Sequence, residues 1–239
     1  MHASSRFQVG DLCLTGVVML VSLPFFLSDW VVHQYILITN DHGILMSFLK
    51  FAVLATMGEV IGLRIKTGKY HQPGFGYLPR AVVWGFLGVT IHLAFVVFPF
   101  GVTQYLEQYV LSGSRQALLL PGLHAAKILV AFSISLVMNL VYAPVMMTLH
   151  KITDTHISYH KGSVKALARP IRMGMILSEI NWEVQWGFVF KKTIPFFWIP
   201  AHTITFLLPE AYRVLFAALL SIMLGVILAV AAVMGKQNT

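Results

Sequence analysis

Apolar residues occur in long blocks, and six blocks have about the length that a helix needs to cross a bilayer. They are Leu12–Leu27, Gly43–Ile65, Ala81–Gly101, Ala125–Leu149, Phe190–Leu208 and Ala211–Met234. The fifth block is the least regular, because Pro195 and Pro200 interrupt it and Lys191 and Lys192 lie near its start. The pattern predicts an all-α, polytopic transmembrane helix bundle of about six spans in a single domain, residues 1–239. A count of four or five spans stays open if the fifth block lies in the interface.

The connection before the fifth block has a different pattern. Apolar residues at helical spacing follow Arg169 and Arg172, with Trp182 and Trp186 one turn apart behind them. Basic residues combined with tryptophans are typical of a helix that lies in the headgroup layer. The segment over about 164–187 therefore predicts an interfacial amphipathic helix, although an amphipathic helix that covers the inner end of the bundle fits the pattern equally.

Composition supports the membrane class. Hydrophobic residues make up 57% of the chain and charged residues only 11%, against about a quarter in soluble domains. The net charge is +8, and 13 of the 17 Lys and Arg residues fall in the termini and the connections that six spans place on one side. The positive-inside rule then predicts that both termini are cytoplasmic and that the basic inner loops meet anionic lipid headgroups. The single cysteine, Cys13, excludes an internal disulfide.

Small residues recur at helical spacing in three of the spans, where they allow close helix contact. The stripes are Ala217, Ser221, Gly225 and Ala229 in the sixth span, Ala52, Ala55, Glu59 and Gly62 in the second, and Gly85, Gly88 and His92 in the third. We expect these faces to point into the bundle. Glu59 and His92 then point away from lipid.

Ionisable or polar residues at membrane depth are costly and are usually paired, hydrated or functional. The candidates for a substrate pathway are Lys50, Glu59, His92, Lys127, Asn139 and His202, with Lys191 a further intramembrane charge. Lys50 and Lys127 fall in the outer third, where they either form an electropositive vestibule or snorkel to the headgroups.

Two further pairs of residues lie at other levels of the predicted spans. Glu59 and Lys191 fall in the inner third and form either a structural pair or part of a conduction path. His92 and Asn139 fall near the middle, and His92 is either a packing histidine or a proton-sensitive gate.

Signals for enzymatic chemistry are weak. His150, His156 and His160 form the one tight histidine group, and such a group on a basic loop is either a metal site or a solvated face. The sequence has no G-x-S-x-G, no H-E-x-x-H and no phosphate-binding glycine loop. We expect no catalytic residues, no metal, no cofactor and no nucleic-acid partner.

Several short motifs resemble those of the Mpv17/PMP22 family of small integral membrane proteins. Residues 208–216 resemble its closing "VP..YRvlf" signature, residues 197–200 its "WP" element, and residues 57–59 its "GD", with Glu in place of Asp. Residues 87–92 resemble "GP..H" with Val89 in place of proline, and residues 138–144 resemble "DQ....aP" with Met138 and Asn139 in place of the acid and the amide. The matched positions are Gly58, Glu59, His92, Asn139, Pro144, Trp198, Pro209, Tyr212 and Arg213.

This resemblance implies a multi-span helical protein of organelle or bacterial membranes that acts as a channel or metabolite pore. The first span, Leu12–Leu27, departs from the family, which usually has fewer spans. The absence of an Arg-rich and Ser-rich transit segment favours a bacterial inner membrane.

Three functions follow as hypotheses. The first is a channel or passive carrier for small solutes, anionic ones included. The second is a non-transporting scaffold or lipid-organising subunit in which the intramembrane charges are paired. The third is an intramembrane enzyme. The expected partners are the bilayer, a small solute and, as an open alternative, a second copy of the chain.

Overall fold

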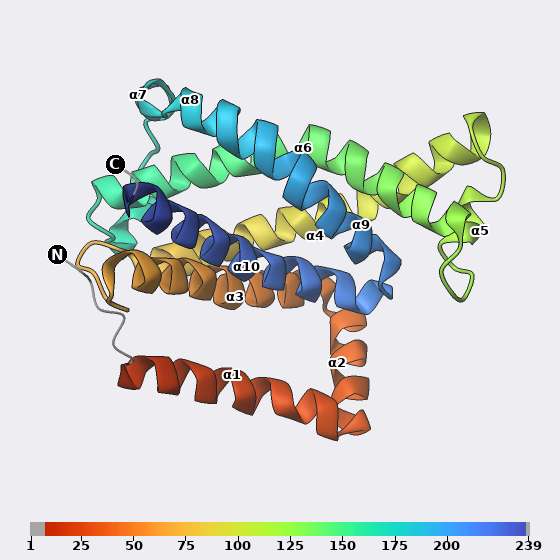
Figure 1. The fold of residues 1–239 in the computed structure, drawn as a ribbon, viewed down its shortest axis with the longest axis horizontal. Helices are drawn as coiled ribbons and strands as arrows, with labels where there is room; N and C mark the ends of the chain where they lie inside the picture. The colour runs from red at the N-terminus through yellow and green to blue at the C-terminus, as the bar shows by residue number, and fades with distance from the viewer. Residues whose placement is uncertain (1–7, 238–239) are drawn as a thin grey trace.

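The structure is a computed structural model that describes residues 8–237, with the backbone alone described at 21, 228 and 230–237. The long helices are α1 (Val9–Leu27), α2 (Asp29–Asp41), α3 (Gly43–Thr67), α4 (Tyr77–Tyr109), α6 (Ala125–Tyr159), η2 (Gln185–Trp198), α9 (Ile199–Leu207) and α10 (Glu210–Gln237). The short ones are α5 (Ser114–Ala117), η1 (Val164–Ala168), α7 (Met173–Glu179) and α8 (Trp182–Val184). Helices α3, α4, α6 and α10 run lengthwise as a bundle, and α1 runs beside them (Figure 1).

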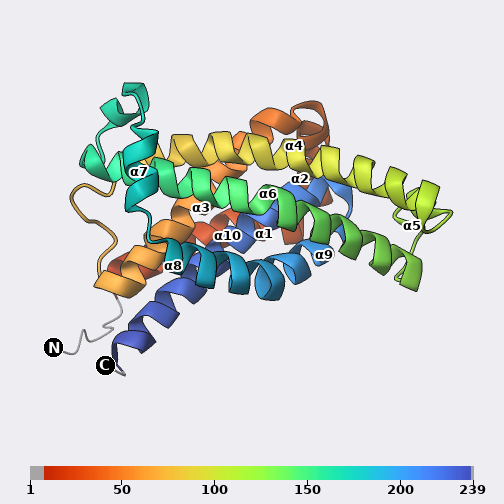
Figure 2. The same ribbon diagram turned by 90° about the horizontal axis from the view of Figure 1, so that it is seen from above.

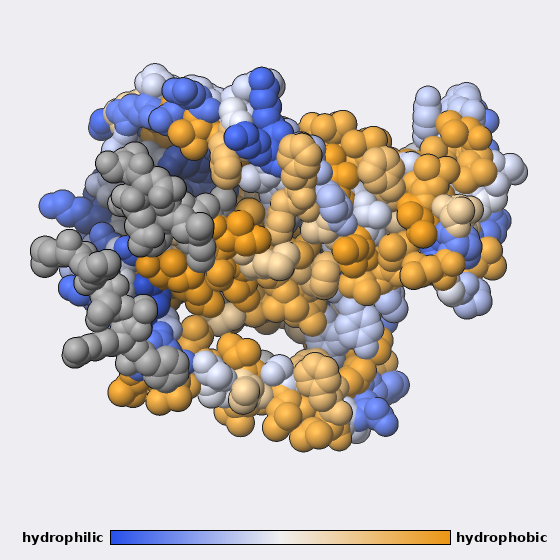
Figure 3. All heavy atoms as spheres, in the orientation of Figure 1, coloured by the Kyte–Doolittle hydropathy of each residue, from blue (hydrophilic) through white to orange (hydrophobic). Residues whose placement is uncertain are grey.

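The predicted all-α architecture is confirmed. Among the described residues, five helices are long and apolar enough to cross a membrane. These are α1, α3, α4, α6 and the part of α10 up to Ile227, and they coincide with five of the six predicted spans. Most hydrophilic residues gather toward one end of the molecule and a smaller group lies at the other, while hydrophobic residues cover much of the surface between them (Figure 3). We call the first of these two ends the basic end, since Arg64, Lys66, Lys69 and Arg80 lie where α3 ends and α4 begins.

Two helices are longer than the sequence predicted. Helix α4 has 33 residues and α6 has 35, so each extends about 50 Å, against a hydrocarbon core of about 30 Å. The two helices lie side by side. At the end of the molecule away from the basic end they project together past the other helices, and α5 connects them there (Figure 2).

The fifth predicted span stays helical through both of its prolines. The chain is helical from Gln185 to Leu207, first as the π-helix η2 with Pro195 inside, and then as α9 with Pro200 in its first turn. The backbone N–H of Ile199 donates to the carbonyl of Ile194 five residues earlier, which is the π pattern. The expectation of a helix interrupted at these prolines is therefore wrong.

The segment over 164–187 forms no continuous amphipathic helix. It contains η1, α7 and α8 and then enters η2. Arg169 has an extended backbone (φ −95°, ψ 142°), as expected for a residue before proline, and this ends η1. Ile180 is also extended, and the side chain of Asn181 then caps α8 by accepting from the backbone N–H of Val184.

The predicted small-residue stripes are the closest helix contacts in the bundle. A Cβ added to Gly58 of α3 would lie 2.9 Å from Cα of Ile222 in α10, and one added to Gly225 would lie 3.0 Å from the carbonyl oxygen of Gly58. Nearer the start of α3, a Cβ on Gly88 of α4 would lie 2.7 Å from the carbonyl oxygen of Ser47. Helix α3 therefore packs directly on both α10 and α4 through backbone contact.

We expect Gly225→Leu to lower the stability of the folded protein by about 2 kcal/mol, because the new side chain would meet the backbone of α3. Thermal unfolding in detergent measures the effect. The matched control is Gly101→Leu on α4, whose added Cβ meets nothing within 4 Å. Equal melting of the two variants would contradict the backbone contact.

Candidate functional site

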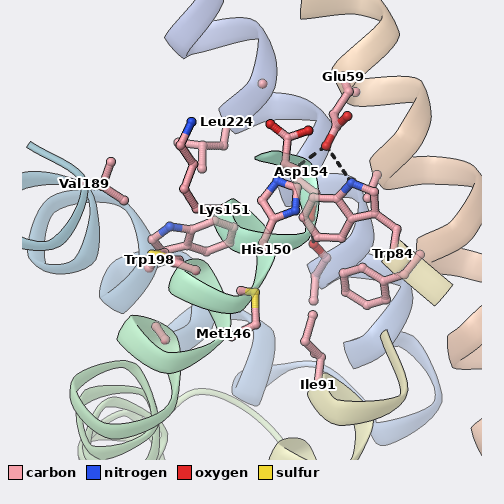
Figure 4. A pocket seen from close by; sticks show the side chains of 18 of the residues that line it. Glu59, Trp84, Ile91, Met146, His150, Lys151, Asp154, Val189, Trp198 and Leu224 are labelled. Carbon is pink, nitrogen blue, oxygen red and sulfur yellow. Dashed lines mark hydrogen bonds and ion pairs between the residues drawn. The ribbon is translucent and has the colours of Figure 1, made fainter. Parts of the chain in front are cut away.

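A cluster of charged and polar side chains joins three helices toward the basic end. Arg80, in the first turn of α4, donates from Nη1 to Oε2 of Glu59 on α3 at 2.7 Å and forms an ion pair with Asp154 on α6. Nε1 of Trp84 donates to Oε1 of Glu59 at 2.7 Å, and Nε2 of His150 lies 3.4 Å from the same oxygen. We call these five residues the Glu59 cluster (Figure 4 shows Glu59, Trp84, His150 and Asp154).

The Glu59 cluster is mostly shielded from solvent. The side chains of Arg80 and Glu59 are only 11% and 18% exposed. The ring of His150 packs on Trp84 with centroids 4.3 Å apart, and the guanidinium of Arg80 lies 4.6 Å from the ring centroid of Phe75. An ion pair in such surroundings holds its helices together only while both partners are present.

The predicted partner of Glu59 was wrong. Lys191 and Lys192 are exposed on η2, and Nζ of Lys192 lies over the ring of Phe188. Arg80 is the partner instead, because α4 begins beside the end of α3 and its first turn faces Glu59.

A second polar group lies deeper in the bundle. Oδ1 of Asn139 on α6 lies 3.0 Å from Nδ1 of His202 on α9, and Nδ2 of Asn139 donates to the carbonyl of Ser135 at 2.8 Å. The hydroxyl of Ser135 donates to the carbonyl of Ile199 at 2.7 Å. An amide oxygen only accepts hydrogen bonds, so Nδ1 of His202 is the donor in this contact. Trp198 stacks on His202 with centroids 5.2 Å apart.

One cavity of about 450 Å³ connects the two polar groups. Glu59, Arg80, His150 and Asp154 line it at one level and Asn139, Trp198 and His202 at another, and Phe51, Ile91, Met138 and Met146 are among its apolar walls. Its volume falls in the range of about 300–1,000 Å³ typical of small-molecule sites. Side chains of α3, α4, α6, η2, α9 and α10 all contribute to the cavity.

His92 lies outside this cavity. It borders a separate cleft together with Glu210 and Arg213, and a Cβ added to Gly43, the first residue of α3, would lie 3.0 Å from its ring. The sequence placed His92 near the middle of its span. The structure places it level with the start of α3, because α4 continues far beyond that level.

The two predicted vestibule lysines do not line the cavity. Nζ of Lys50 donates to the hydroxyl of Thr39 at 3.2 Å and lies 4.5 Å from the ring centroid of Tyr35, so Lys50 faces α2. Nζ of Lys127 donates to the carbonyl of Leu120 at 2.8 Å. Both side chains are used in local contacts at the end opposite the basic end.

The remaining motif positions have structural contacts. Gly58 packs on α10, and the carbonyl of Pro144 accepts from the hydroxyl of Thr148. The carbonyl of Pro209 accepts from the backbone N–H of Tyr212, whose ring stacks on Tyr35. Arg213 donates to the carbonyls of Phe206 and Leu208 and so satisfies the end of α9.

The predicted histidine group is divided by the structure. His150 joins the Glu59 cluster, whereas Nε2 of His156 lies 3.0 Å from the carbonyl of Ala166 and its ring packs on His160. Among the described residues, no three His, Cys, Asp or Glu side chains lie together as a metal site would need.

The sequence contained an overlooked signal for the Glu59 cluster. Arg80 and Trp84 are four residues apart, as are His150 and Asp154, so each pair shares a helix face. The signal was missed because α6 was predicted to end at Leu149 and Arg80 was counted only as a topology charge.

Comparisons with known proteins give no relative. No family model matches the chain. No curated protein matches it. No solved structure matches it.

We expect Arg80→Gln to destabilise the protein by about 3 kcal/mol, because it leaves two shielded carboxylates without their cation. Adding Glu59→Gln to this variant should restore part of the loss, since one uncompensated charge is then removed. Thermal unfolding in detergent measures both. Arg115→Gln, at an exposed position, is the control, and a wild-type melting temperature for Arg80→Gln would refute the bridging role.

Proposed function

We propose that the protein is an integral membrane carrier that moves a small solute passively through the cavity between the Glu59 cluster and the Asn139–His202 pair. The observation that carries this proposal is the cavity itself, at about 450 Å³, inside a bundle of apolar helices. Cavities of this size, with apolar walls and a few converging polar groups, are the usual form of a small-molecule site.

The charges of the cavity favour an anionic solute over a cationic one. Lys66, Arg80 and Lys151 line it together with the two carboxylates of Glu59 and Asp154, so basic groups are in excess. The sequence led us to expect an anion preference from Lys50 and Lys127. In this proposal the preference comes instead from Lys66, Lys151 and Arg80.

A carrier fits the geometry better than an open channel. Beyond the level of His202 the core is tightly packed, with Phe206 and Ile134 at most 1% exposed and the rings of Phe95 and Phe206 5.2 Å apart. A solute that enters from the basic end therefore needs a change of conformation to leave at the other. The π-helix η2 is the wall segment suited to this change, since such widened turns often lie at functional sites.

Six spans belong to the same proposal. Five helices qualify as spans by length and composition. The helix from Gln185 to Leu207, which lies along α6 and precedes α10 in the chain, is the additional span that brings the total to six. With six spans, both termini lie on the cytoplasmic side under the positive-inside rule, in a bacterial inner membrane. The resemblance to the Mpv17/PMP22 family agrees with a solute pathway of this kind.

The flux of small anions into proteoliposomes tests this function. We expect uptake above empty liposomes across a panel of small carboxylates and phosphates, and an uptake at least fivefold lower for Ala143→Phe, which fills the cavity from α6. Val141→Phe is the matched control, because Val141 is 60% exposed on the same helix. Absence of flux for the whole panel would contradict the carrier.

Absence of flux would favour the second hypothesis, a scaffold without transport. One observation supports that alternative, namely that Glu59, Arg80 and Asp154 are paired with one another and that Lys50 is hydrogen-bonded. An ordered lipid in the cavity would then replace the solute.

A further inference from the structure

Helix α1 is attached to the bundle at both ends but not along its middle. A space-filling view shows an opening that passes between α1 and the rest of the molecule, with a rim that is largely hydrophobic (Figure 3). We call this opening the α1 window. It lies outside the cavity described above, whose lining includes no residue of α1.

Specific polar contacts close the α1 window at the basic end. Asp11 accepts from Nε and Nη2 of Arg64 at 3.0 and 2.9 Å and from the hydroxyl of Tyr70 at 2.7 Å. Nε2 of Gln8 donates to the carbonyl of Gly68. Burial raises the pKa of Tyr70, and the hydrogen bond to Asp11 acts in the same direction, so the phenol stays a donor.

Aromatic contacts close the other end through α2. The ring of Phe25 meets Tyr35 edge-on at 5.5 Å, Tyr35 stacks on Tyr212 at 5.9 Å, and its hydroxyl donates to the carbonyl of Ala211. Lys50 of α3 lies over the ring of Tyr35. Both ends of α1 are thereby held at a fixed place.

The spacing of residues along α1 and α3 shows which face of each helix lines the α1 window. Asp11 and Phe25 are fourteen residues apart, nearly four whole turns, so they share the face of α1 that is turned to the bundle. Lys50 and Arg64 define the facing side of α3 by the same spacing. The window between these ties is about 21 Å long, which is more than one leaflet of a hydrocarbon core of about 30 Å.

The face of α1 between the ties carries Thr15, Val18 and Ser22, and the hydroxyls of Thr15 and Ser22 donate to the carbonyls of Asp11 and Val18 in their own helix. Val18 lies midway between Asp11 and Phe25 and is 44% exposed, and Val53 on the α3 wall is 62% exposed. The opening in Figure 3 is closed at both ends by the ties, and its rim is largely hydrophobic, so it suits a flexible hydrocarbon chain.

We infer that the α1 window is a binding site for an acyl chain of a phospholipid with an anionic headgroup. The chain fills the space between Val18 and the α3 wall. The headgroup lies at the basic end, where Lys69 is exposed next to Gly68, whose carbonyl accepts from Gln8. Such a lipid is a structural component and does not depend on the proposed transport.

Native mass spectrometry of the full-length protein, extracted from vesicles of phosphatidylglycerol and phosphatidylcholine, tests this site. We expect the wild type to retain one phosphatidylglycerol at collision energies that remove the other lipids. Val18→Trp, which fills the window, should reduce the retained fraction at least fivefold. Leu20→Trp is the matched control, because Leu20 lies half a turn round on the opposite face of α1 and is 75% exposed.

Three outcomes would overturn the inference. The first is a wild type that retains no lipid, and the second is Val18→Trp retaining as much lipid as Leu20→Trp. The third is a wild type with the mass of a dimer that Val18→Trp converts to monomer. That result would identify a second copy as the occupant. Melting curves of both variants show that they are folded. Ala143→Phe should keep the lipid, so that loss of flux and loss of lipid are distinguished.

Discussion

The arrangement of the bundle depends on one cation, Arg80, placed between two carboxylates on different helices. A charge removed from water is tolerated only with a partner at close range, and here Glu59, Arg80 and Asp154 satisfy one another across α3, α4 and α6. The first turn of α4 is therefore fixed against both neighbours. The cavity exists because these three helices meet at the cluster while the residues beyond it, among them Ala55 and Ala143, are too small to fill the space between them.

The π-helix η2 determines which side chains reach that cavity. Widening the helix around Pro195 changes the phase of the residues that follow, and Trp198 and His202, four residues apart, both line the cavity while Lys191 and Lys192 are exposed. A regular helix would carry these residues around at 3.6 per turn. The irregular helix thus connects a backbone constraint to the chemistry of the site.

The sequence was sufficient for what depends on composition and spacing. Five spans and the glycine contacts of α3 with α4 and α10 follow from apolar length and small-residue period, which are local properties. The pairing of Glu59 with Arg80 was missed, because it depends on where α4 begins relative to the end of α3. His92 was predicted near the middle of its span, and it is the sixteenth of the 33 residues of α4. The place of α1 depends on Tyr70 in a loop, whose tertiary contact no periodicity encodes.

Helix α3 separates two polar environments, and this explains the positions of its two buried charges. Lys50 and Glu59 are nine residues apart, half a turn out of phase, so they cannot serve the same space on a straight helix. Glu59 faces the cavity with α4 and α6, whereas Lys50 faces α2, beside the aromatic tie that holds α1. The same helix is therefore a wall of the cavity on one side and of the α1 window on the other. Because Arg64 pairs with Asp11, α1 is attached directly to the helix that forms a wall of the cavity.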